Sequence, residues 1–477
     1  MAMLGKRRPP RLRSGVSGLQ GRGDARRSQP VAVDEEEGSV EIQSLAHDGR
    51  GVARTAAGKT VFVEGALPGE RVRIAVHRTR QRFDEAHVRE LITSSQERAT
   101  PPCAHYGTCG GCDLQHLAVP AQRRHKTEVL RELLARQGIA LEASLALLHR
   151  ASEGYRRRAR LGVRVDGEGR VHLGFRARHQ HRLVDIGDCP VLVPSLSRLL
   201  VPLHSLVASL DAPRHVGHLE LLESDQGVSL VVRQLREHDA DTRRWRAFAE
   251  AQGMHLGRWL GREAPAFEWL TQAPALSCRL PAGEQELTLG FAPGDFLQAN
   301  EAVNREMVST ARTWLTPLPE RVLDLFAGVG NFSLPLAAGG ARVTAVEGSP
   351  AMVERLADNA CRNGLDVGAR QADLNDPTAI RPLLETVSPG CVVLDPPRSG
   401  AEAVCHQLAA HPVAQVLYVA CDPATLARDV ACLVHGGYRV VRAAVADMFV
   451  HTSHLEAMLL LEHPTPVRQH QGASLDG

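Results

Sequence analysis

The sequence predicts a multidomain protein with a small N-terminal β-barrel, a central, mostly antiparallel β region and a C-terminal α/β domain of Rossmann type. Three observations predict this architecture. The chain has 477 residues, enough for roughly three domains of about 150 residues each. Its first part contains short alternating strands divided by glycine-rich turns. Its last part contains buried-type strands divided by helical stretches, which is typical of a doubly wound parallel sheet.

The composition is that of a globular protein, with 43% hydrophobic and 23% charged residues. No run of about eighteen apolar residues occurs, which excludes a membrane-spanning helix. The first residues, MAMLGKRRPPRLRSG, are basic but lack the apolar segment of a secretion signal, so we expect a cytoplasmic protein. Ten cysteines in a long chain without such a signal indicate metal binding or catalysis rather than a set of disulfides.

Positive charge is concentrated in a few segments. The whole chain has 56 Lys and Arg against 54 Asp and Glu, but residues 1–30 hold eight Lys or Arg and one Asp, so the remainder has a net charge of −5. Two arginine clusters follow, at 71–82 and 155–182. Such concentrations suit a polyanion, and nucleic acid is the obvious one. Residues 1–30 are also poor in apolar side chains, and we predict a disordered basic arm there and a tail at 466–477.

Residues 32–94 are predicted to form the barrel. From Gly38 onwards, β-branched and polar residues alternate, and glycine-rich turns occur at His47–Gly51 and Leu67–Gly69. Five short strands in about sixty residues fit a small barrel of the oligonucleotide-binding type.

Residues 95–297 form the predicted central region. A cysteine-bearing stretch from Cys103 to His116 precedes an amphipathic helix from about Pro120 to Arg136. The strands beyond it include two hairpins, with turns at Asp166–Gly169 and Asp225–Gly227. Because long antiparallel strands here carry arginine on one face, we expect this region to bind RNA.

Residues 298–465 form the predicted α/β domain, with the buried-type strands RVLDLF, RVTAVE, CVVLDPP and VLYVACD. The first strand leads directly into a glycine turn, AGVGNFSLPLA. In this turn Gly328 and Gly330 allow a ligand to approach the backbone at the start of a helix. Ser333 stands where a dinucleotide-binding loop has its third glycine, which disfavours a nicotinamide cofactor and an oxidoreductase.

Two acidic residues complete the predicted nucleoside site. Glu347 ends the second strand and is placed to bind ribose hydroxyls, and Asp373 is placed to reach an adenine edge. The arrangement resembles the S-adenosylmethionine-dependent methyltransferases, whose first motif is also an acidic strand followed by G-x-G. The alternative is that the two glycines only make a tight turn between strand and helix.

Three later motifs carry a more specific resemblance. They are Asp395-Pro-Pro-Arg-Ser-Gly, Cys421-Asp-Pro-Ala-Thr and MFVHTSHLEAM near the end. Together they resemble the bacterial RNA uracil-C5 methyltransferases, over nearly the whole chain. The barrel resembles a TRAM domain, which implies the branch of this family that acts on 23S rRNA, because the tRNA branch lacks that domain. The resemblance implies methyl transfer from S-adenosylmethionine to C5 of one specific uridine.

The resemblance also implies roles for individual residues. Cys421 corresponds to the nucleophile, and Glu456 in HTSHLEAM corresponds to the general base. The implied cofactor-binding residues are Gln298, Phe326, Asn331, Glu347, Asp373 and Asp395, with Phe296 as a candidate for stacking on the target base. The family has Asn where this chain has Asp422, and a negative charge there would oppose formation of the thiolate.

The same chemistry follows from the residue types. C5 of uracil is a weak nucleophile, and addition of a thiolate at C6 converts the ring into an enolate whose C5 attacks an electrophilic methyl group. A base must then remove the C5 proton so that the thiolate can leave. A carboxylate suits this step, because the proton lies alpha to a carbonyl and burial raises a carboxylate pKa toward neutrality. The uracil must be flipped out, since C5 and C6 are unreachable while it is stacked.

A separate group of cysteines indicates a metal centre. Cys103, Cys109 and Cys112 lie within ten residues of one another, and Cys189 is the candidate for a fourth ligand. Four thiolates suit either an iron–sulfur cluster or structural zinc, and the spacing alone does not choose between them. The resemblance implies a [4Fe–4S] cluster. Because it lies between two arginine-rich regions, we expect a structural role at the RNA-binding surface rather than a redox role.

The predicted partner is 23S rRNA, in a single-stranded or loop region, and we expect a monomer that does not associate with membranes. Aromatic residues make up only 4% of the chain, so we expect recognition to depend on arginine–phosphate contacts and RNA shape more than on stacking. Two alternatives stay open. One is methylation of a tRNA T-loop, and the other is an RNA-binding iron–sulfur protein without catalysis, against which the presence of both Cys421 and Glu456 argues.

Overall fold

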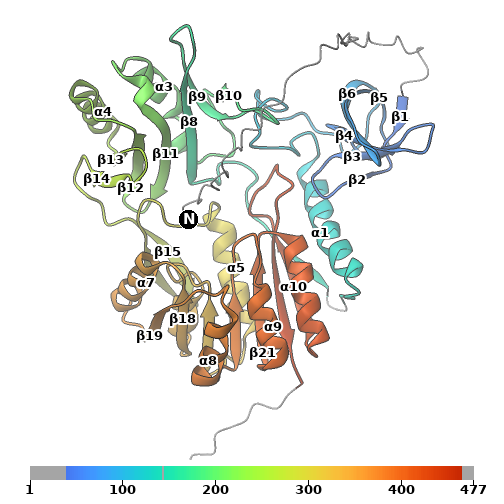
Figure 1. The fold of residues 1–477 in the computed structure, drawn as a ribbon, viewed down its shortest axis with the longest axis vertical. Helices are drawn as coiled ribbons and strands as arrows, with labels where there is room; N and C mark the ends of the chain where they lie inside the picture. Colours follow the sequence, from blue (N-terminus) through green and yellow to red (C-terminus); the bar gives the residue numbers. More distant parts are fainter. Residues whose placement is uncertain (1–38, 142–143, 465–477) are drawn as a thin grey trace, which may run out of the picture.

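The computed structural model describes residues 39–141 and 144–464. The predicted arm at 1–30 and tail at 466–477 lie outside these residues. The described part of the chain contains four sheets, of six, seven, two and eight strands. In Figure 1 the six-stranded sheet lies at the upper right, the seven-stranded sheet at the upper left and the eight-stranded sheet below them.

The six-stranded sheet lies inside the predicted barrel region, and its strand order is β1-β5-β6-β4-β3-β2. Its strands are β1 Ser39–Glu41, β2 Ser44–Leu45, β3 Gly51–Arg54, β4 Thr60–Glu64, β5 Arg71–Thr79 and β6 Phe83–Thr93. Alternate residues point inwards, and Val61, Val63 and Val72 are buried in its core. Three register shifts between β5 and β6 bend the sheet. The small β unit is thus present, with six strands instead of the five predicted.

Helix α1 (Val119–Arg136) connects this unit to the rest of the protein, and its bounds agree with the predicted helix. Pro120 stands in its first turn, where a missing N–H costs nothing. Leu130 of α1 packs in one core with Leu426 of helix α10 (Pro423–His435). The helix is therefore held by the C-terminal part of the chain, far away in sequence.

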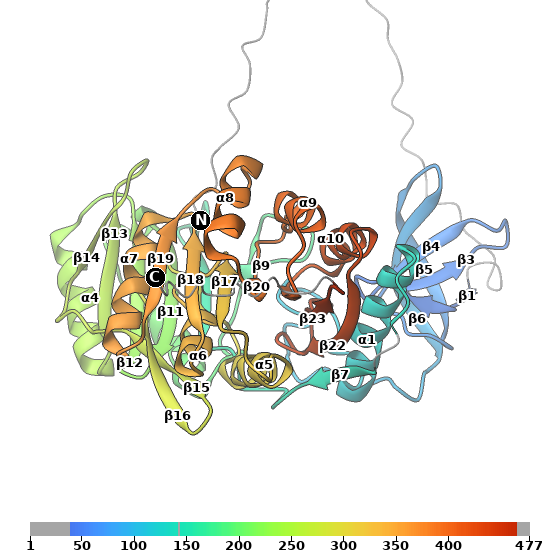
Figure 2. The same cartoon turned by 90° about the horizontal axis from the view of Figure 1, so that it is seen from below.

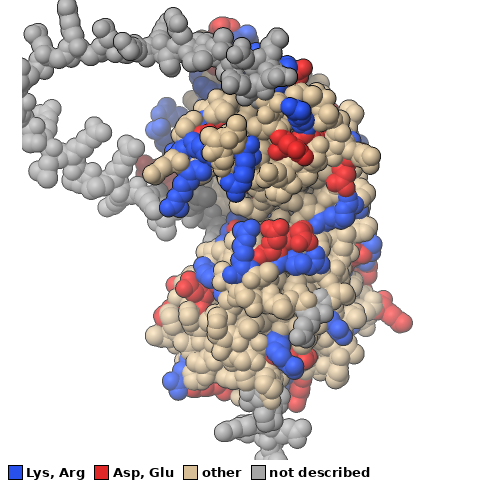
Figure 3. Space-filling view, turned by 90° about the vertical axis from the view of Figure 1, so that its right-hand side faces the viewer, with Lys and Arg blue, Asp and Glu red and all other residues tan. Residues whose placement is uncertain are grey.

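The outer face of α1 carries paired charges, with ion pairs between Arg131 and Glu128 and between Arg136 and Glu132. Figure 3 looks onto the right-hand side of the view in Figure 1 and shows basic and acidic side chains next to one another on this side of the molecule. Within the described residues, no helix is both long enough and apolar enough to span a bilayer.

The seven-stranded sheet forms the central region, in the order β10-β9-β8-β11-β12-β13-β14, and only β12 and β13 are parallel. Its strands are β8 Arg158–Val165, β9 Val171–Arg176, β10 Leu183–Asp185, β11 Val216–Ser224, β12 Gly227–Gln234, β13 His255–Leu260 and β14 Ala266–Trp269. Both predicted hairpins are confirmed, as β8–β9 and β11–β12.

One face of this central sheet is covered by helices. They are α2 Pro194–Ser197, α3 Leu200–Ala208 and α4 Asp239–Gln252, with a short 3-10 helix at Pro213–His215. Leu161, Leu219 and Leu230 of the sheet pack there with Leu203 of α3 and Trp245 of α4. A two-stranded hairpin, β15 (Ser277–Ala282) and β16 (Gln285–Gly290), then leads into the last part of the chain.

The eight-stranded sheet has the order β19-β18-β17-β20-β21-β23-β22-β7. Its strands are β7 Leu145–Leu148, β17 Arg321–Leu325, β18 Arg342–Glu347, β19 Val367–Gln371, β20 Cys391–Leu394, β21 Gln415–Ala420, β22 Arg439–Ala446 and β23 Glu456–Glu462. The strands from β17 to β21 run parallel, and β23 is antiparallel to its neighbours β21 and β22. The four strands predicted from their buried pattern are β17, β18, β20 and β21.

Helices cover both faces of the eight-stranded sheet, which confirms the predicted α/β domain (Figure 2). One face is covered by α5 Glu301–Trp314, α6 Ser333–Ala338 and α7 Pro350–Arg362. The other is covered by α1, α8 Pro377–Val387, α9 Glu402–Ala410 and α10. The predicted α/β domain begins at residue 298, but one strand of its sheet comes from earlier in the chain. Strand β7 precedes the central sheet in sequence and pairs with β22. The predicted boundaries therefore omit α1 and β7 from the sheet on which they pack.

Candidate active site

Four parallel strands of the large sheet end at the same edge, and each is followed by a predicted site residue. Phe326 follows β17, Glu347 ends β18, Asp395 follows β20 and Cys421 follows β21. In open α/β sheets, ligands bind in the crevice outside the carboxyl ends of the strands. The fold therefore brings together residues that are spread over about a hundred positions of the sequence.

Cys421 and Glu456 come together through the pairing of β21 with β23. This antiparallel ladder ends with Ala420 opposite Ala457, and Cys421 and Glu456 are the next residues of the two segments. The charge of Glu456 acts on the thiol of Cys421, so the two side chains are near each other. Glu456 is opposite Ala446 of β22. It is the first residue of its own strand, β23.

The thiol of Cys421 lies in an acidic environment. Its pKa is raised to about 11, first by burial and then by the carboxyl groups of Glu456 and Asp395, whereas Arg398 opposes the rise. Asp422, whose charge we expected to oppose formation of the thiolate, has its carboxylate engaged by the backbone of the following helix. Asp422 caps α10 and accepts hydrogen bonds from the backbone N–H groups of Ala424 and Thr425.

The two carboxyl groups near Cys421 also titrate abnormally. Glu456 is only 4% exposed, and its pKa is raised well above its ordinary value, by burial and by Asp395. The pKa of Asp395 is raised to about 7, by burial and by Asp324. Burial of this kind makes a carboxylate a better proton acceptor near neutral pH. The site thus pairs a thiol with a carboxylate base, and Arg398 favours the ionised forms of both.

The loop between β17 and α6 has the backbone of a ligand-binding turn. Phe326, Gly328 and Gly330 all have positive φ, of 64°, 59° and 105°. The carboxylate of Glu347 accepts a hydrogen bond from the N–H of Gly328, with 3.1 Å between N and Oε2. Ser333 is buried, and its hydroxyl donates a hydrogen bond to Asp324 in the middle of β17. The serine at the third glycine position therefore fixes an acidic group beneath the loop.

Two of the predicted or neighbouring site residues have a buried oxygen atom without a partner among the described residues. They are Gln298, at Oε1, and Asp324, at Oδ1. A buried polar atom without a hydrogen bond is costly unless a ligand or water satisfies it. Gln298 lies two residues after Phe296, whose side chain is 62% exposed. These features fit a site for a polar ligand, with an aromatic ring at its rim.

Two of the predicted cofactor-binding residues, Asn331 and Asp373, form hydrogen bonds to other residues of the protein. The amide of Asn331 forms reciprocal hydrogen bonds with the amide of Asn304 on α5, at 2.8 and 3.0 Å. Asp373, two residues beyond β19, is exposed and accepts hydrogen bonds from the backbone and side chain of Asn375. Asn331 therefore holds the glycine loop against α5, and Asp373 lies at the outer rim.

The segment that precedes Glu456 is held by the cysteine-bearing segment. Asp113 accepts hydrogen bonds from the backbone N–H and the hydroxyl of Ser453, both at 2.7 Å. His451 has a positive φ of 69°, and its carbonyl accepts from the N–H groups of Asp113 and Leu114. Gln122 of α1 accepts from the N–H of His451 at 2.9 Å. Sequence reasoning missed Asp113 and Gln122, and nothing in their local patterns marks them.

Two further residues of the site were missed although the sequence carried a signal. Asp324 is the one charged residue in the interior of the buried strand RVLDLF. Its pKa is raised to about 7, mainly by burial. Arg398 stands in the motif that begins at Asp395 and is the cation that acts on both Cys421 and Glu456.

The four predicted metal-ligating cysteines gather in one place. Burial raises the pKa of Cys109, Cys112 and Cys189, and the cysteines of the set raise the pKa of one another further. Cys112 and Cys189 pack against a small core that contains Tyr155, whose hydroxyl donates to the carbonyl of Val450 at 2.9 Å. The set of donors is thus four clustered thiols, which is the donor set of an iron–sulfur cluster or of structural zinc.

A second group of candidate metal ligands lies in the central region. Among the described residues, the one group of three or more candidate ligand atoms within 4.8 Å of one another is Asp211, His238 and Asp241. Arg244 forms ion pairs with both of these aspartates, so this group is neutralised.

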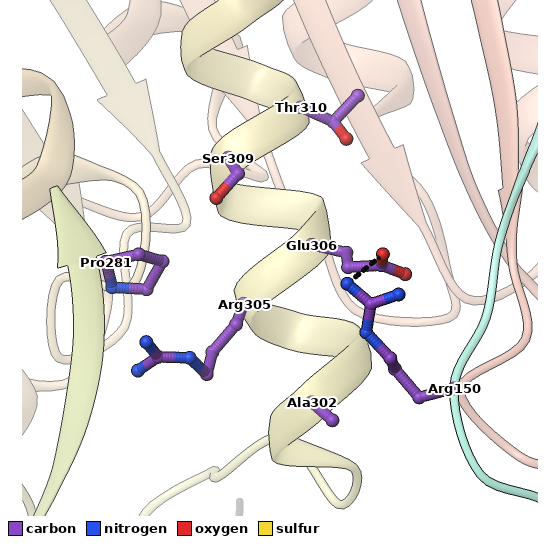
Figure 4. A pocket seen from close by; sticks show the side chains of 7 residues that line it. All are labelled: Arg150, Pro281, Ala302, Arg305, Glu306, Ser309 and Thr310. Atoms are coloured by element: carbon purple, nitrogen blue, oxygen red, sulfur yellow. Dashed lines mark ion pairs between the residues drawn. The ribbon is translucent and has the colours of Figure 1, made fainter. Parts of the chain in front are cut away.

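A cavity of about 380 Å³ lies apart from the predicted site, along α5 (Figure 4). Its lining residues are Arg150, Pro281, Ala302, Arg305, Glu306, Ser309 and Thr310. Arg150 points to Glu306 and forms an ion pair with it, and Arg305 is paired with Glu286. Both cations are therefore neutralised, and none of the predicted site residues lines this cavity.

Comparison with known proteins identifies the family. The sequence profile of the tRNA (uracil-5-)-methyltransferase family matches residues 120–368 and 382–464, and that of the TRAM domain matches residues 36–88. The chain belongs to the tRNA (uracil-5-)-methyltransferase family. It is an S-adenosylmethionine-dependent methyltransferase, and its six-stranded unit is a TRAM domain. The family match is interrupted between residues 368 and 382, where Asp373 lies.

Several relatives match along nearly the whole chain. A protein of Halomonas elongata named 23S rRNA (uracil(1939)-C(5))-methyltransferase RlmD is 68% identical, with 100% of both chains covered. Proteins of the same name from Chromohalobacter salexigens and Pectobacterium atrosepticum are 56% and 41% identical, over 98% and 91% of this chain and 97% and 95% of theirs.

A solved structure shares the fold. The tRNA (uracil-54, C5)-methyltransferase of Pyrococcus abyssi, in complex with S-adenosyl-L-homocysteine, has a TM-score of 0.69 at 22% identity. The match covers 89% of this chain and 100% of that one. It supports the order of the central and α/β units described above.

Proposed function

We propose that this methyltransferase transfers a methyl group to C5 of uracil 1939 in 23S rRNA. The names of relatives that are 68% and 56% identical support this substrate, as does the TRAM domain at the N-terminus. The observation that carries the proposal is the pairing of β21 with β23, whose last pair is Ala420 with Ala457, together with the effect of Glu456 and Asp395 on the thiol of Cys421. A thiol and a buried carboxylate at one point of the sheet edge are the two groups that C5 chemistry needs.

The reaction proceeds through a covalent adduct with Cys421. The thiolate adds to C6 of the flipped uracil, a C–S bond forms, and the electron pair of the C5–C6 double bond becomes an enolate. S-adenosylmethionine, when bound, would supply an electrophilic methyl group and would keep the electron pair of the broken methyl–sulfur bond on its own sulfur. The enolate forms the C5–methyl bond, Glu456 removes the C5 proton, and the C–S bond breaks to restore the double bond and the thiolate. The buried Glu456 suits the proton step because its pKa is raised.

The residues around the glycine loop are proposed to hold the cofactor. Glu347 is proposed to bind the ribose hydroxyls, and Gln298 offers a buried oxygen atom without a partner. Asp395, which follows β20 at the sheet edge, is proposed to contact both the cofactor and the base. Phe326 and Asn331 shape the loop, and Asp373 is proposed as an outer contact to adenine. The exposed ring of Phe296 is proposed either to stack on the flipped uracil or to fill the space that the uracil leaves in the RNA base stack.

The four clustered thiols are proposed to bind a [4Fe–4S] cluster. The convergence of four thiols supports a metal centre, and the resemblance to the uracil-C5 methyltransferases favours the cluster over zinc. The cluster would hold Cys103, Cys109 and Cys112 against Cys189 and would thereby fix the segment that carries Asp113. Iron and acid-labile sulfide at about four each per chain are expected in protein purified without air. Zinc in place of iron would contradict the assignment.

A mechanism-based RNA tests the reaction. Fluorine at C5 cannot be removed as a proton, so RNA with 5-fluorouridine at position 1939 should form an adduct with the enzyme that survives a denaturing gel, and only when S-adenosylmethionine is present. The adduct should disappear in Cys421→Ala. Unchanged methylation by Cys421→Ala would refute the mechanism, and an RNA-binding iron–sulfur protein without catalysis would give no adduct with any RNA.

The position in the RNA is tested in cells. Mass mapping of rRNA from cells that lack this protein should show unmethylated uracil at position 1939 and full methylation after the gene is restored. Loss of methylation in a tRNA T-loop instead would favour the tRNA alternative. An rRNA substrate places the enzyme in the cytoplasm, where we propose that it acts as a monomer.

A further inference from the structure

The central sheet has a second face, which the helices α2, α3 and α4 do not cover. Leu161, Leu219 and Val232 point into the helix-covered core, so the neighbouring residues Gly162, His218 and Arg233 point to the opposite face. On β13, Arg258 hydrogen-bonds to Thr242 of α4 and thus lies on the helix side. Trp259, its neighbour, therefore lies on the open face.

Residues of the open face form a continuous row across five strands. His218 of β11 is opposite Gly162 of β8 on one side and Arg233 of β12 on the other. Arg233 is opposite Trp259 of β13, and Trp259 is opposite Phe267 of β14. Arg160 of β8 joins the row, because its guanidinium lies 3.2 Å from Nδ1 of His218. We call Arg160, His218, Arg233, Trp259 and Phe267 the cross-strand row.

One half of the cross-strand row is basic. Glu220, which is opposite Arg160 in the ladder, forms its ion pair with Arg158 instead. The guanidinium of Arg233 donates only to backbone carbonyls, those of Gln234, Trp259 and Arg262. Within the described residues, neither Arg160 nor Arg233 forms an ion pair with a carboxylate. Burial and these two cations lower the pKa of His218 to about 4, as expected where positive charge is not neutralised.

The other half of the row is aromatic. The rings of Trp259 and Phe267 have centroids 5.0 Å apart, and that of Trp269 lies 5.2 Å from Phe267. All three are partly exposed, in contrast to Trp245, which is 1% exposed in the core under α4. Gly257 makes room for this cluster, because a Cβ at that position would lie 2.9 Å from the ring of Phe267.

The aromatic half lies next to the active-site loop. A Cβ on Gly294 would lie 3.7 Å from the ring of Trp259. The next residue, Asp295, is fixed by an ion pair with Arg355, and its carbonyl accepts from Arg158 of the same sheet. Phe296, the exposed ring proposed to contact the target base, follows directly. The row therefore leads from the middle of the open face to the entrance of the site.

We propose that the cross-strand row binds the single-stranded RNA that flanks the target uridine. Arg160 and Arg233 contact phosphates, and unpaired bases stack on Trp259 and Phe267. Stacking on an aromatic side chain requires bases that are free of a duplex, so the partner is single-stranded. This inference rests on the proposed function only in that the substrate is RNA. It gives stacking a larger part in recognition than the low aromatic content had indicated.

Binding of a short single-stranded RNA, measured by fluorescence anisotropy at several salt concentrations, tests the basic half. Arg160→Gln and Arg233→Gln should each weaken binding and each reduce the slope of log K against log salt by about 1. Arg246→Gln is the matched control, because Arg246 is exposed on α4, on the covered side of the sheet. Unchanged slopes in both row variants, or an equal change in the control, would overturn the proposal.

The aromatic half is tested with two substitutions of one residue. Trp259→Leu should weaken binding of single-stranded RNA about five-fold or more and leave binding of duplex RNA unchanged. Trp259→Phe should retain most of the affinity but lose the quenching of tryptophan fluorescence that RNA causes in the wild type. Circular dichroism shows whether each variant is folded. Wild-type affinity in a folded Trp259→Leu, or quenching that persists in Trp259→Phe, would overturn the proposal.

The test separates this inference from the proposed function. The variants are made in a Cys421→Ala background as well, in which RNA binding is measured without any methyl transfer. If methylation of 23S rRNA is confirmed but the row variants bind RNA as the wild type does, only the cross-strand row is refuted. If the row binds RNA but no methylation occurs, the proposed function fails and the row stands.

Discussion

Asp113 holds Ser453 by two hydrogen bonds, each 2.7 Å long, to its backbone N–H and its hydroxyl. Asp113 is the residue after Cys112, and Ser453 lies three residues before Glu456. A carboxylate that accepts two bonds in this way fixes both the position and the orientation of its partner. The segment with the clustered cysteines is therefore bonded directly to the segment that carries the proposed base.

We expect Asp113→Asn to slow methyl transfer without weakening RNA binding. Asparagine is neutral, and its NH2 group can only donate to the Ser453 hydroxyl, so the charge-assisted bonds are weakened, by about 1.5–3 kcal/mol for a bond to a charged group. The rate under single-turnover conditions should fall about ten-fold, with Kd for RNA unchanged. Asp188→Asn is the control, since Asp188 also precedes a clustered cysteine and accepts from a serine, Ser197, but has no bond to the base segment. Equal effects of the two substitutions would contradict this positioning role.

Glu456→Gln should trap the covalent intermediate. The glutamine cannot remove the C5 proton, and without that step the bond to Cys421 cannot break. With ordinary uridine RNA and S-adenosylmethionine, a complex that resists denaturation should accumulate, whereas the wild type shows none. Release of methylated RNA at the wild-type rate would exclude Glu456 as the base.

Replacement of Arg398 should change the pH dependence of the reaction. Arg398 is the cation that opposes the raised pKa values of Cys421 and Glu456, so Arg398→Gln should raise both. Less thiolate is then present at neutral pH, and the rate at pH 7 should fall several-fold. The deficit should narrow as the pH rises toward the thiol pKa of about 11, because more thiolate then forms. Arg398→Lys should restore most of the rate.

The control for this series is Arg439→Gln. Arg439 is exposed at the start of β22, where it is opposite Glu462 and thus at the other end of β23 from Glu456. Its pH profile should match that of the wild type. A profile of Arg398→Gln that also matches the wild type would show that Arg398 does not act on the thiol.

Asp324→Asn should stabilise the protein at neutral and alkaline pH. The folded-state pKa of Asp324 is about 7, above its ordinary value of 3.8, so the native state holds this proton more tightly than the unfolded state. The resulting stability is full below about pH 4 and is lost as the pH rises to about 7. Asparagine avoids this loss, and the gain should reach up to about 4 kcal/mol above pH 7. Thermal unfolding from pH 4 to pH 8 measures it.

The same variant should lower the pKa of Asp395, because the charge of Asp324 contributes to its rise. A stability difference between the variant and the wild type that does not depend on pH would contradict the assignment of this titration to Asp324.

Much of the site could be predicted because it follows the ends of buried strands. Glu347, Asp395 and Cys421 each stand directly at such an end, and the buried pattern of β18, β20 and β21 is plain in the sequence. The place of Glu456 came only from the family resemblance, because strand order and register are long-range properties. The orientation of Asp422 could have been predicted, since an aspartate followed by proline is a signal for the start of a helix.

The parts that escaped prediction depend on contacts between distant segments. Asp113 and Gln122 contact residues more than three hundred positions away. The cross-strand row joins residues of five strands, and no local pattern reveals which strands are neighbours. The low overall content of aromatic residues was also misleading, because three of them gather in one cluster on the open face.

The pairing of β7 with β22 has a consequence for how the protein is made. During translation β7 and α1 leave the ribosome early, whereas their partners β22 and α10 are among the last segments to emerge. Until then the apolar side of α1, including Leu130, has no covering and is open to chaperones and proteases. A nascent chain that stops short cannot bury this surface, so truncated products should be degraded rather than persist as RNA-binding fragments that compete with the finished enzyme.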